Sequence, residues 1–280
     1  MPDEPTGDDR MTVLGETARV VGRFFDLKAD DYEKRMSSPY WRLMREITWQ
    51  HVRRFLPREK GASVLDAGGA TGYWSLRLAE AGYRVVLVDA SEGMLALAAE
   101  KVRRAGLSSM IEIVRGDITD MREFSEGAFD AALAVEEPLS FCGDADMAAA
   151  ELALVTKPGG MVAASVVNRF KVQEFEKYLK KGDVDGLAAY VESGILEKAD
   201  EAGGAITIRT FRAEDVEALF HANSLDVVSA IGKPVFAGNL GGRLADPPSF
   251  SRILQMELAH NGERSLWGSA DVLEFVAIKA

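Results

Sequence analysis

The chain has 280 residues, 47% of them hydrophobic, and a formal net charge of −11. This length accommodates one large core domain together with an insertion. The acidic charge makes nucleic acid an unlikely partner, because proteins that bind it usually neutralise phosphates with a basic patch. The densest basic segment, residues 51–60, indicates a solvated helix end, although it leaves a nucleic-acid substrate open.

The sequence gives no sign of a membrane segment or a structural metal. No apolar run approaches the roughly 18–20 residues that span a bilayer. Residues 1–14 are acidic and contain proline and glycine, which predicts a flexible tail rather than a secretory signal. Cys142 is the single cysteine, so an internal disulfide and a multi-cysteine metal site are excluded. A cytoplasmic location is the default expectation, and the oligomeric state is not predicted.

The first predicted unit, residues 15–60, is an N-terminal helical cap. Its apolar and charged residues alternate at helical spacing. Residues 37–39 mark a break, and a helix over about residues 40–55 follows.

Residues 61–167 show a different rhythm, in which short apolar runs alternate with helical stretches. Strands are predicted at 62–65, 83–88, 110–114, 129–135 and 161–167. Helices are predicted at 73–80, 93–105 and 146–155, and a turn at 157–160. Strands that are apolar throughout and alternate with helices indicate a mostly parallel sheet covered on both faces.

The rhythm lapses at residues 168–210 and resumes at residues 211–280. The first segment predicts helices near 170–181 and 185–199 and a strand at 205–209. The second predicts helices at 213–221 and 249–261 and strands at 225–231 and 271–279. We therefore predict a Rossmann-like, doubly wound α/β fold with a seven-stranded sheet and an inserted lid after the fifth strand. Such sheets place substrate contacts in loops and lids near the carboxyl ends of their strands.

A glycine-rich turn, residues 68–72, follows the first predicted strand. Glycines let the backbone turn tightly and approach a ligand without an intervening Cβ. A dinucleotide loop has the pattern G-x-G-x-x-G, but Ala70 and Tyr73 occupy its second and third glycine positions. The Gly-Lys-Ser/Thr ending of a P-loop is also absent. The turn has no basic residue, which suits a cationic sulfonium ligand without phosphates.

The turn resembles the first motif, D/E-x-G-x-G-x-G, of class I S-adenosylmethionine-dependent methyltransferases. Asp66, Gly68 and Gly72 match this motif, and Ala70 replaces its middle glycine. The resemblance covers residues 30–160 well and the remainder only in the order of elements. It implies that S-adenosyl-L-methionine is the cofactor and S-adenosyl-L-homocysteine the product. The residues of this segment implied to bind the cofactor are Asp66, Ala67, Gly68, Gly69 and Gly72.

The end of the second strand continues the resemblance. In the family, an acid at the position of Asp89 accepts both ribose hydroxyl hydrogens, and a residue at the position of Met94 packs on the adenine. Ala90 lies between them and is predicted to contact the cofactor. A helix N-cap next to Ser91 is the alternative role for Asp89.

The ends of the third and fourth predicted strands also resemble this family. By resemblance, Asp117 accepts from the adenine amino group and Ile118 packs on the ring, while Val135 and Glu136 border the methionine moiety. Four such loops in the expected order strengthen the assignment of the family.

Upstream of the glycine turn, residues 30–33 resemble a tyrosine segment of small-molecule methyltransferases. In that reading Tyr32 closes over the cofactor. Arg42 or Arg45 pairs with the cofactor carboxylate, or both are surface arginines on an amphipathic helix.

Catalytic residues stay unassigned, because methyl transfer needs mainly alignment and exclusion of water. A base is required only if the acceptor must lose a proton. Glu136 and Glu137 follow the fourth strand; Glu136 is the candidate, with a structural role as the alternative. Their Glu-Glu-Pro-Leu sequence differs from the Asn/Asp-Pro-Pro-Tyr/Phe pattern of enzymes that methylate amino groups.

We expect a small-molecule acceptor. Aromatic residues of the insertion supply part of its pocket or are packing residues, and these are Phe170, Phe175, Tyr178 and Tyr190. Histidines 51, 221 and 260 are expected to be surface or packing residues. The alternatives are methylation of protein or RNA, and a non-catalytic protein that binds S-adenosylmethionine or its product.

Overall fold

The computed structural model describes residues 14–199, 205–238, 244 and 246–280. Apart from Leu14, the predicted tail at residues 1–14 lies outside the described residues. Leu14 itself is buried.

A seven-stranded sheet forms the centre of the molecule, in the order β3-β2-β1-β4-β5-β9-β8. Its strands are β1 Ser63–Ala67, β2 Arg84–Asp89, β3 Ile111–Arg115, β4 Phe129–Ala134, β5 Thr156–Val167, β8 Leu225–Lys233 and β9 Val272–Lys279. Strands β1 to β5 pair in parallel, whereas β9 runs antiparallel to both of its neighbours, β5 and β8. The predicted seven-stranded, mostly parallel Rossmann-like sheet is therefore confirmed.

Two layers of helices cover the sheet. One face carries α3 Pro39–Val52, α4 Tyr73–Glu80 and α5 Glu92–Ala105. The other carries α6 Pro138–Phe141, α7 Ala145–Val155 and α10 Ala213–Ala222. The adjacent residues Val64 and Leu65 of β1 are fully buried in opposite layers. This explains why the parallel strands are apolar throughout instead of alternating with polar residues.

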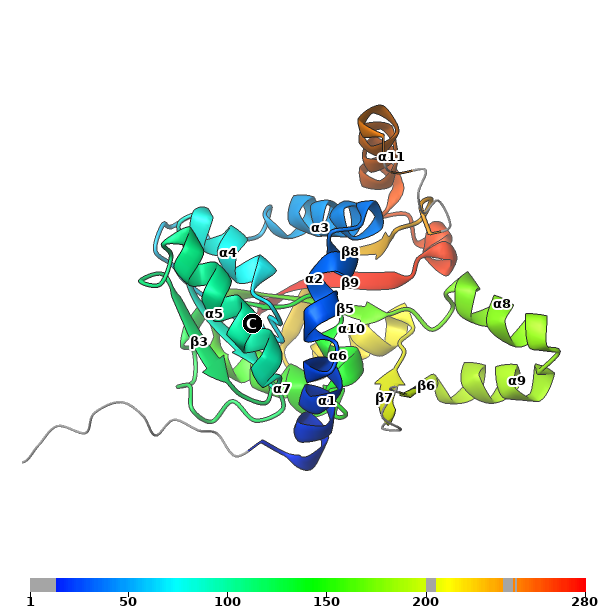
Figure 1. Ribbon diagram of the computed structural model, residues 1–280, viewed down its shortest axis with the longest axis horizontal. Coiled ribbons are helices and arrows are strands. Elements are labelled where there is room, and N and C mark those ends of the chain that lie inside the picture. Colours follow the sequence, from blue (N-terminus) through cyan, green and yellow to red (C-terminus); the bar gives the residue numbers. More distant parts are fainter. Residues whose placement is uncertain (1–13, 200–204, 239–243, 245) are drawn as a thin grey trace, which may run out of the picture.

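Four further helical segments of the described chain lie outside these layers. Helices α1 Glu16–Asp26 and α2 Ala29–Met36 stand in line across the front of the molecule (Figure 1). Helix α11 Pro247–His260 packs on α3, and a short 3-10 helix, Arg264–Ser269, precedes β9. Within the described part of the chain, no helix has both the length and the apolar character needed to cross a membrane.

The insertion after β5 forms a separate lobe. It comprises α8 Val172–Lys181, α9 Val184–Ser193, β6 Ile195–Ala199 and β7 Ala205–Arg209. Helices α8 and α9 project from the body at the right of Figure 1. The predicted helix over 185–199 is wrong in its second half, because Gly194 adopts a φ of 68° and ends α9. The chain then becomes β6 and pairs with β7.

The predicted turn at 157–160 is also incorporated into a strand. Strand β5 begins at Thr156, which pairs with Phe129, and the register shifts before Ala131 pairs with Met161. The residues of the predicted turn make the strand irregular, since Gly159 has a φ of 75° within it. A bulge of this kind lets a strand continue past a residue that departs from extended geometry.

A buried polar cluster fixes α3 to the sheet. Glu274 on β9 accepts from Thr48 at 2.8 Å, lies 2.9 Å from His51 Nδ1 and forms an ion pair with Lys233. Burial alone raises the pKa of Glu274, but Lys233 and His51 outweigh that effect and hold the pKa at about 2. His51 is thus a packing residue, one of the two roles that the sequence predicts for it. The cluster matters for the site because α3 also carries Arg45.

Candidate functional site

A pocket of about 880 Å³ lies at the carboxyl ends of β1 to β4. The predicted cofactor residues that line it are Tyr32, Gly68, Gly69, Asp89, Ala90, Met94, Asp117, Ile118 and Val135. Glu136 lines it as well. The four loops that the sequence selects therefore meet around one cavity, at the edge where open parallel sheets bind ligands.

Three of the predicted residues, Asp66, Ala67 and Gly72, do not line this pocket. Asp66 is buried beneath the glycine turn, and its Oδ2 accepts from Ser75 Oγ at 2.6 Å. Burial raises the pKa of Asp66 to about 7. A Cβ on Gly69 would lie 2.8 Å from Asp66 Oδ2. Asp66 therefore supports the turn from below and joins it to α4.

Ala70, in the place of the middle glycine, adopts a positive φ like the two glycines beside it in the motif. Its φ is 46°, between Gly68 and Gly72, which both have a φ of 75°. A left-handed conformation is strained for a residue with a Cβ. The amide of Ala70 donates to Asp89 Oδ2 at 2.9 Å. This bond offsets part of the strain and attaches the turn to the end of β2.

Asp89 holds two backbone segments and also faces the pocket. Its Oδ1 accepts from the amide of Ser91 at 2.8 Å, opposite the bond to Ala70. Ser91, whose Oγ accepts from Met94 N at 3.1 Å, is the N-cap of α5. The N-cap alternative for Asp89 is therefore wrong. A carboxylate has about four lone-pair positions, so two accepted bonds leave Asp89 able to accept more.

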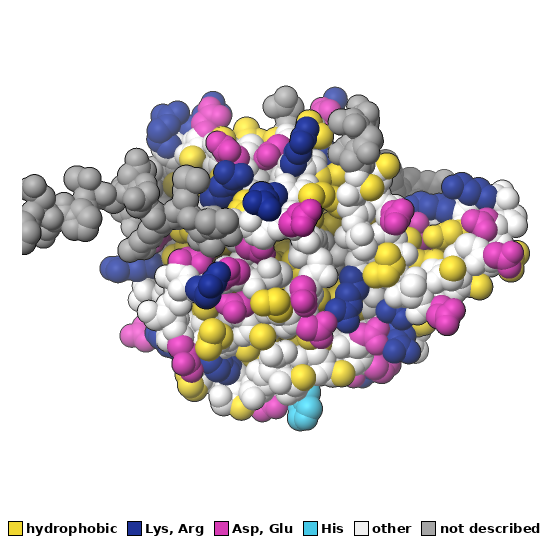
Figure 2. Space-filling model, turned by 90° about the horizontal axis from the view of Figure 1, so that it is seen from below, with side chains coloured by type: hydrophobic (Ala, Val, Ile, Leu, Met, Phe, Trp, Pro, Cys, Tyr) yellow, Lys and Arg dark blue, Asp and Glu magenta, His cyan; other side chains and the backbone are white. Residues whose placement is uncertain are grey.

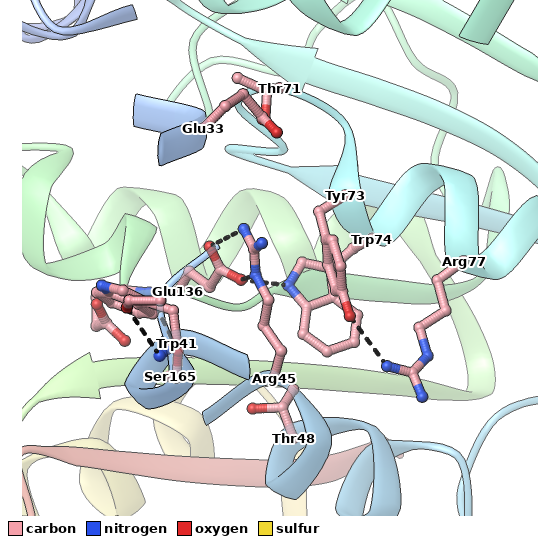
Figure 3. Close-up of polar contacts among 12 residues, drawn as sticks. Glu33, Trp41, Arg45, Thr48, Thr71, Tyr73, Trp74, Arg77, Glu136 and Ser165 are labelled. Atoms are coloured by element: carbon pink, nitrogen blue, oxygen red, sulfur yellow. Dashed lines mark hydrogen bonds and ion pairs between the residues drawn. The ribbon is translucent and has the colours of Figure 1, made fainter. Parts of the chain in front are cut away.

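Arg45 and Glu136 form a buried ion pair in the wall of the pocket (Figure 3). Arg45 Nε donates to Glu136 Oε1 at 2.7 Å and Nη2 donates to Oε2 at 3.2 Å. Trp74 Nε1 also donates to Oε1, at 3.0 Å. The Arg45 guanidinium carbon lies 3.9 Å from the centre of the Tyr73 ring. The partner of Arg45 is thus a protein carboxylate, and its surface alternative is wrong.

Arg42, the other arginine weighed for the cofactor carboxylate, lies outside the pocket lining. Its guanidinium carbon is 5.2 Å from the ring centre of Phe250 on α11. Arg42 is exposed, so its surface alternative is confirmed.

Glu137 has an unusual position directly behind Glu136. Both residues have positive φ values, 66° and 69°, and Glu137 is only 8% exposed. Its amide donates to Ser165 Oγ at 3.1 Å, but its Oε1 has no hydrogen-bond partner among the described residues. Burial raises the pKa of Glu137 to about 7. Backbone strain and an unpartnered buried carboxyl group are typical of functional sites.

Helix α1 forms the outer wall of the pocket, through Ala18, Val21, Gly22 and Phe25. A Cβ on Gly22 would lie 2.7 Å from the carbonyl oxygen of Ala90, so α1 approaches β2 closely there. Asp26 Oδ1 accepts from Ser91 Oγ at 2.6 Å and from Gly93 N at 2.8 Å. No residue of α1 is among the predicted pocket residues, and Gly22 inside an amphipathic helix is the signal in the sequence that points to this close approach.

Helix α2 is joined to the glycine turn by a polar contact. Thr71 donates to Glu33, and Lys101 Nζ lies 3.0 Å from Glu33 Oε1 and 3.2 Å from Thr71 Oγ1. The preceding residue, Tyr32, is buried against Met94. This contact places Tyr32 in the pocket lining, as predicted.

Comparisons with known proteins now decide the family. A family model described as a methyltransferase domain matches residues 64–160. The demethylmenaquinone methyltransferase of Thermobifida fusca (strain YX) is 31% identical over 205 residues, which cover 68% of this chain and 84% of that protein. The chain belongs to the class I S-adenosylmethionine-dependent methyltransferases.

A second relative is named as a tRNA methyltransferase, and a solved structure of similar fold is named as a cyclase. The tRNA 5-carboxymethoxyuridine methyltransferase of Escherichia coli (strain K12) is 27% identical over 180 residues, which cover 63% of this chain and 66% of that protein. The solved structure of the cyclase SpnF superposes with a TM-score of 0.63 and 19% identity, covering 95% of this chain and 97% of that chain. Likeness at that identity shows the fold alone.

The aromatic residues of the insertion contact one another instead of lining this pocket. Phe175 lies 6.3 Å from both Phe170 and Tyr190 between ring centres, and Tyr178 stacks on Tyr190 at 5.8 Å. None of the described residues in 168–210 lines the cofactor-loop pocket. The helix that covers this pocket is α1, whereas we expected the insertion to do so.

Replacing Gly22 with alanine is expected to weaken binding of S-adenosyl-L-homocysteine by about 1–2 kcal/mol, or roughly tenfold. The added Cβ would meet the Ala90 carbonyl and push α1 away from the pocket. Calorimetric titration measures the effect. Gly262→Ala is the matched control, because a Cβ there meets nothing within 4 Å. Equal affinities for Gly22→Ala and the unchanged protein would contradict the role given to α1.

Replacing Glu137 with glutamine is expected to reduce the loss in free energy of unfolding between about pH 5 and pH 8. Its folded pKa of about 7 exceeds the ordinary 4.5, so the unfolded chain loses this proton first. Stability therefore falls as pH rises from about 4.5 to 7, by on the order of 3 kcal/mol. Urea unfolding at about pH 5 and pH 8 measures it, with exposed Glu126→Gln as the control. The same pH dependence in Glu137→Gln and the unchanged protein would rule out this effect.

Proposed function

We propose that this protein transfers the methyl group of S-adenosyl-L-methionine to a small-molecule acceptor and releases S-adenosyl-L-homocysteine. The observation that carries the proposal is the convergence of four loops on one pocket, with Asp89 held at its floor by two backbone amides. The remaining lone pairs of Asp89 suit the two hydroxyl groups of a ribose.

The residues of the pocket fit the cofactor part by part. Gly68, with a φ of 75°, lets the turn pass close to Pro138, because a Cβ there would lie 2.7 Å from the Pro138 side chain. Met94 and Ile118 offer apolar surfaces for an adenine ring, and Asp117 offers a carboxylate for its amino group. The glycine turn lacks a cation, as expected for a ligand without phosphates. We infer that Val135 and Glu136 border the methionine part.

Methyl transfer requires mainly that the protein align the reactants and exclude water from them. When bound, the cofactor supplies a methyl group that is already activated on a sulfonium. The chain holds the acceptor in line with that group and excludes water, and α1, Tyr32 and Trp74 form the enclosing walls. Arg45 neutralises Glu136, so this wall adds no net charge beside the reacting groups.

The acceptor class rests on the side chains that surround the pocket and on the charge of the chain. A nucleotide of an RNA would have to be extruded from its strand to enter, and the −11 charge opposes a phosphate backbone. The name of the Thermobifida relative indicates a small organic acceptor, whereas the name of the Escherichia relative indicates tRNA. Methylation of RNA is therefore the alternative that the experiment must separate.

The test uses purified protein, methyl-labelled S-adenosyl-L-methionine and an extract of the source cells. After incubation, small molecules, protein and RNA are separated and counted. We expect label in the small-molecule fraction and none of it with Asp89→Ala. Label that enters RNA or protein instead would contradict the proposed acceptor class.

A further inference from the structure

A second cleft, about 850 Å³ in volume, lies between α8 and the β6–β7 hairpin. Its charged lining residues are Lys171, Lys177, Lys181, Lys198, Glu174 and Glu197. Figure 2 shows lysine and arginine side chains gathered where the lobe of the insertion meets the body. Four lysines around one cleft are unexpected in a chain with a net charge of −11.

The positive charges of this cleft are only partly balanced. Glu174 pairs with Lys177 at 2.9 Å and with Lys171 at 3.6 Å. Lys198 and Lys181 have no ion pair with any described residue. From the body, Lys28 approaches the same place, since Lys28 Nζ lies 4.3 Å and Lys198 Nζ 5.9 Å from the ring centre of Phe24.

The electrostatic effect of this gathering appears at Lys198. Its pKa lies below the ordinary value because the surrounding protein desolvates the ammonium group and because neighbouring cations repel it. Those cations are Arg35, Lys28, Lys171 and Lys177. Like charges brought together without a matching number of carboxylates attract an anion, and a concave surface strengthens the attraction.

The cleft lies next to the wall of the cofactor pocket. The guanidinium carbon of Arg35 is 5.3 Å from the ring centre of Tyr32, which lines the pocket. Phe24 contacts Phe25, another lining residue, at 5.5 Å between ring centres. The charge of Lys171 also opposes the rise in pKa that burial causes at Glu137, the residue after Glu136. Phe24 therefore separates Lys198 in the cleft from Phe25 in the wall of the pocket, and an acceptor that binds both places must extend past this ring.

We propose that this cleft binds the phosphate or carboxylate groups of the methyl acceptor, which is then an anionic small molecule. The inference rests on the proposed function for the identity of the bound molecule. Lysine ammonium groups bind such anions through charge-assisted hydrogen bonds. Glu174 and Glu197 in the same cleft oppose a long phosphate backbone, so we favour a compact anion over RNA.

The experiment measures anion binding directly, without the unidentified acceptor. Pyrophosphate and citrate are titrated separately into the purified protein by calorimetry at about 0.15 M salt. The cleft variant is Lys177→Gln/Lys198→Gln, and the control is Lys180→Gln/Lys60→Gln, which changes the net charge equally outside the cleft lining. Lys180 is on the same helix, α8. The two probes distinguish a phosphate from a carboxylate ligand.

We expect one or both probes to bind the unchanged protein and the control with the same affinity. The cleft variant should bind about tenfold more weakly for each lysine lost. Its affinity for S-adenosyl-L-homocysteine should be unchanged, so failure of the cofactor assignment would be recognised separately. The proposal is overturned if neither probe binds, if the cleft variant binds as tightly as the control, or if only an RNA oligonucleotide binds there.

Discussion

Replacing Asp89 with alanine is expected to weaken binding of S-adenosyl-L-homocysteine by about 2–4 kcal/mol, or roughly 30- to 1000-fold. The substitution removes the two hydrogen bonds that we assign to the ribose. It also removes the two hydrogen bonds that the carboxylate accepts from the backbone amides of Ala70 and Ser91, at 2.9 and 2.8 Å. Calorimetric titration of the folded variant measures the loss.

Two further variants separate these contributions. Asp89→Asn keeps one oxygen acceptor and is expected to fall between the unchanged protein and Asp89→Ala. Asp226→Ala, an exposed aspartate on β8, is the matched control and should bind normally. An unchanged affinity in folded Asp89→Ala would mean that the ribose is held elsewhere.

The second large effect is expected at Arg45. Arg45→Met should lower the free energy of unfolding by about 3–5 kcal/mol, because it leaves Glu136 buried without its counter-ion. The side chains of the two partners are only 9% and 15% exposed, so water replaces the lost contacts only in part. Urea unfolding at neutral pH measures the change.

A double variant provides the control for Arg45. Arg45→Met/Glu136→Gln removes the unpaired charge while leaving Trp74 an oxygen to which it can donate. We expect this double variant to recover most of the lost stability, since the penalty in Arg45→Met comes from the unpaired carboxylate. If the double variant is no more stable than Arg45→Met, the desolvated charge is not the cause.

The convergence of the four loops on one pocket was predictable because its signals are local. Each ligand loop follows an apolar strand directly, and strands β1 to β4 are parallel neighbours in the sheet. Residues such as Asp89 and Asp117 therefore reach the same edge whatever the details of the loops. The orientation of Asp66 was not predictable, because its partner Ser75 and the close approach of Gly69 depend on the folded turn.

The cover of the pocket depends on contacts between residues far apart in the sequence. Asp26 of α1 bonds to Gly93, and Arg45 of α3 bonds to Glu136, and no short-range pattern indicates either contact. The same limit explains the error after Ser193. Residues 195–199 suit a helix locally, but pairing with β7 makes them a strand.

The most direct test of the cofactor assignment is a calorimetric titration of the unchanged protein with S-adenosyl-L-homocysteine and, separately, with NAD. We predict that one molecule of S-adenosyl-L-homocysteine binds per chain, that Asp89→Ala weakens this binding, and that NAD gives no comparable heat. Tighter binding of NAD, or no binding of S-adenosyl-L-homocysteine by folded protein, would contradict the assignment of this pocket.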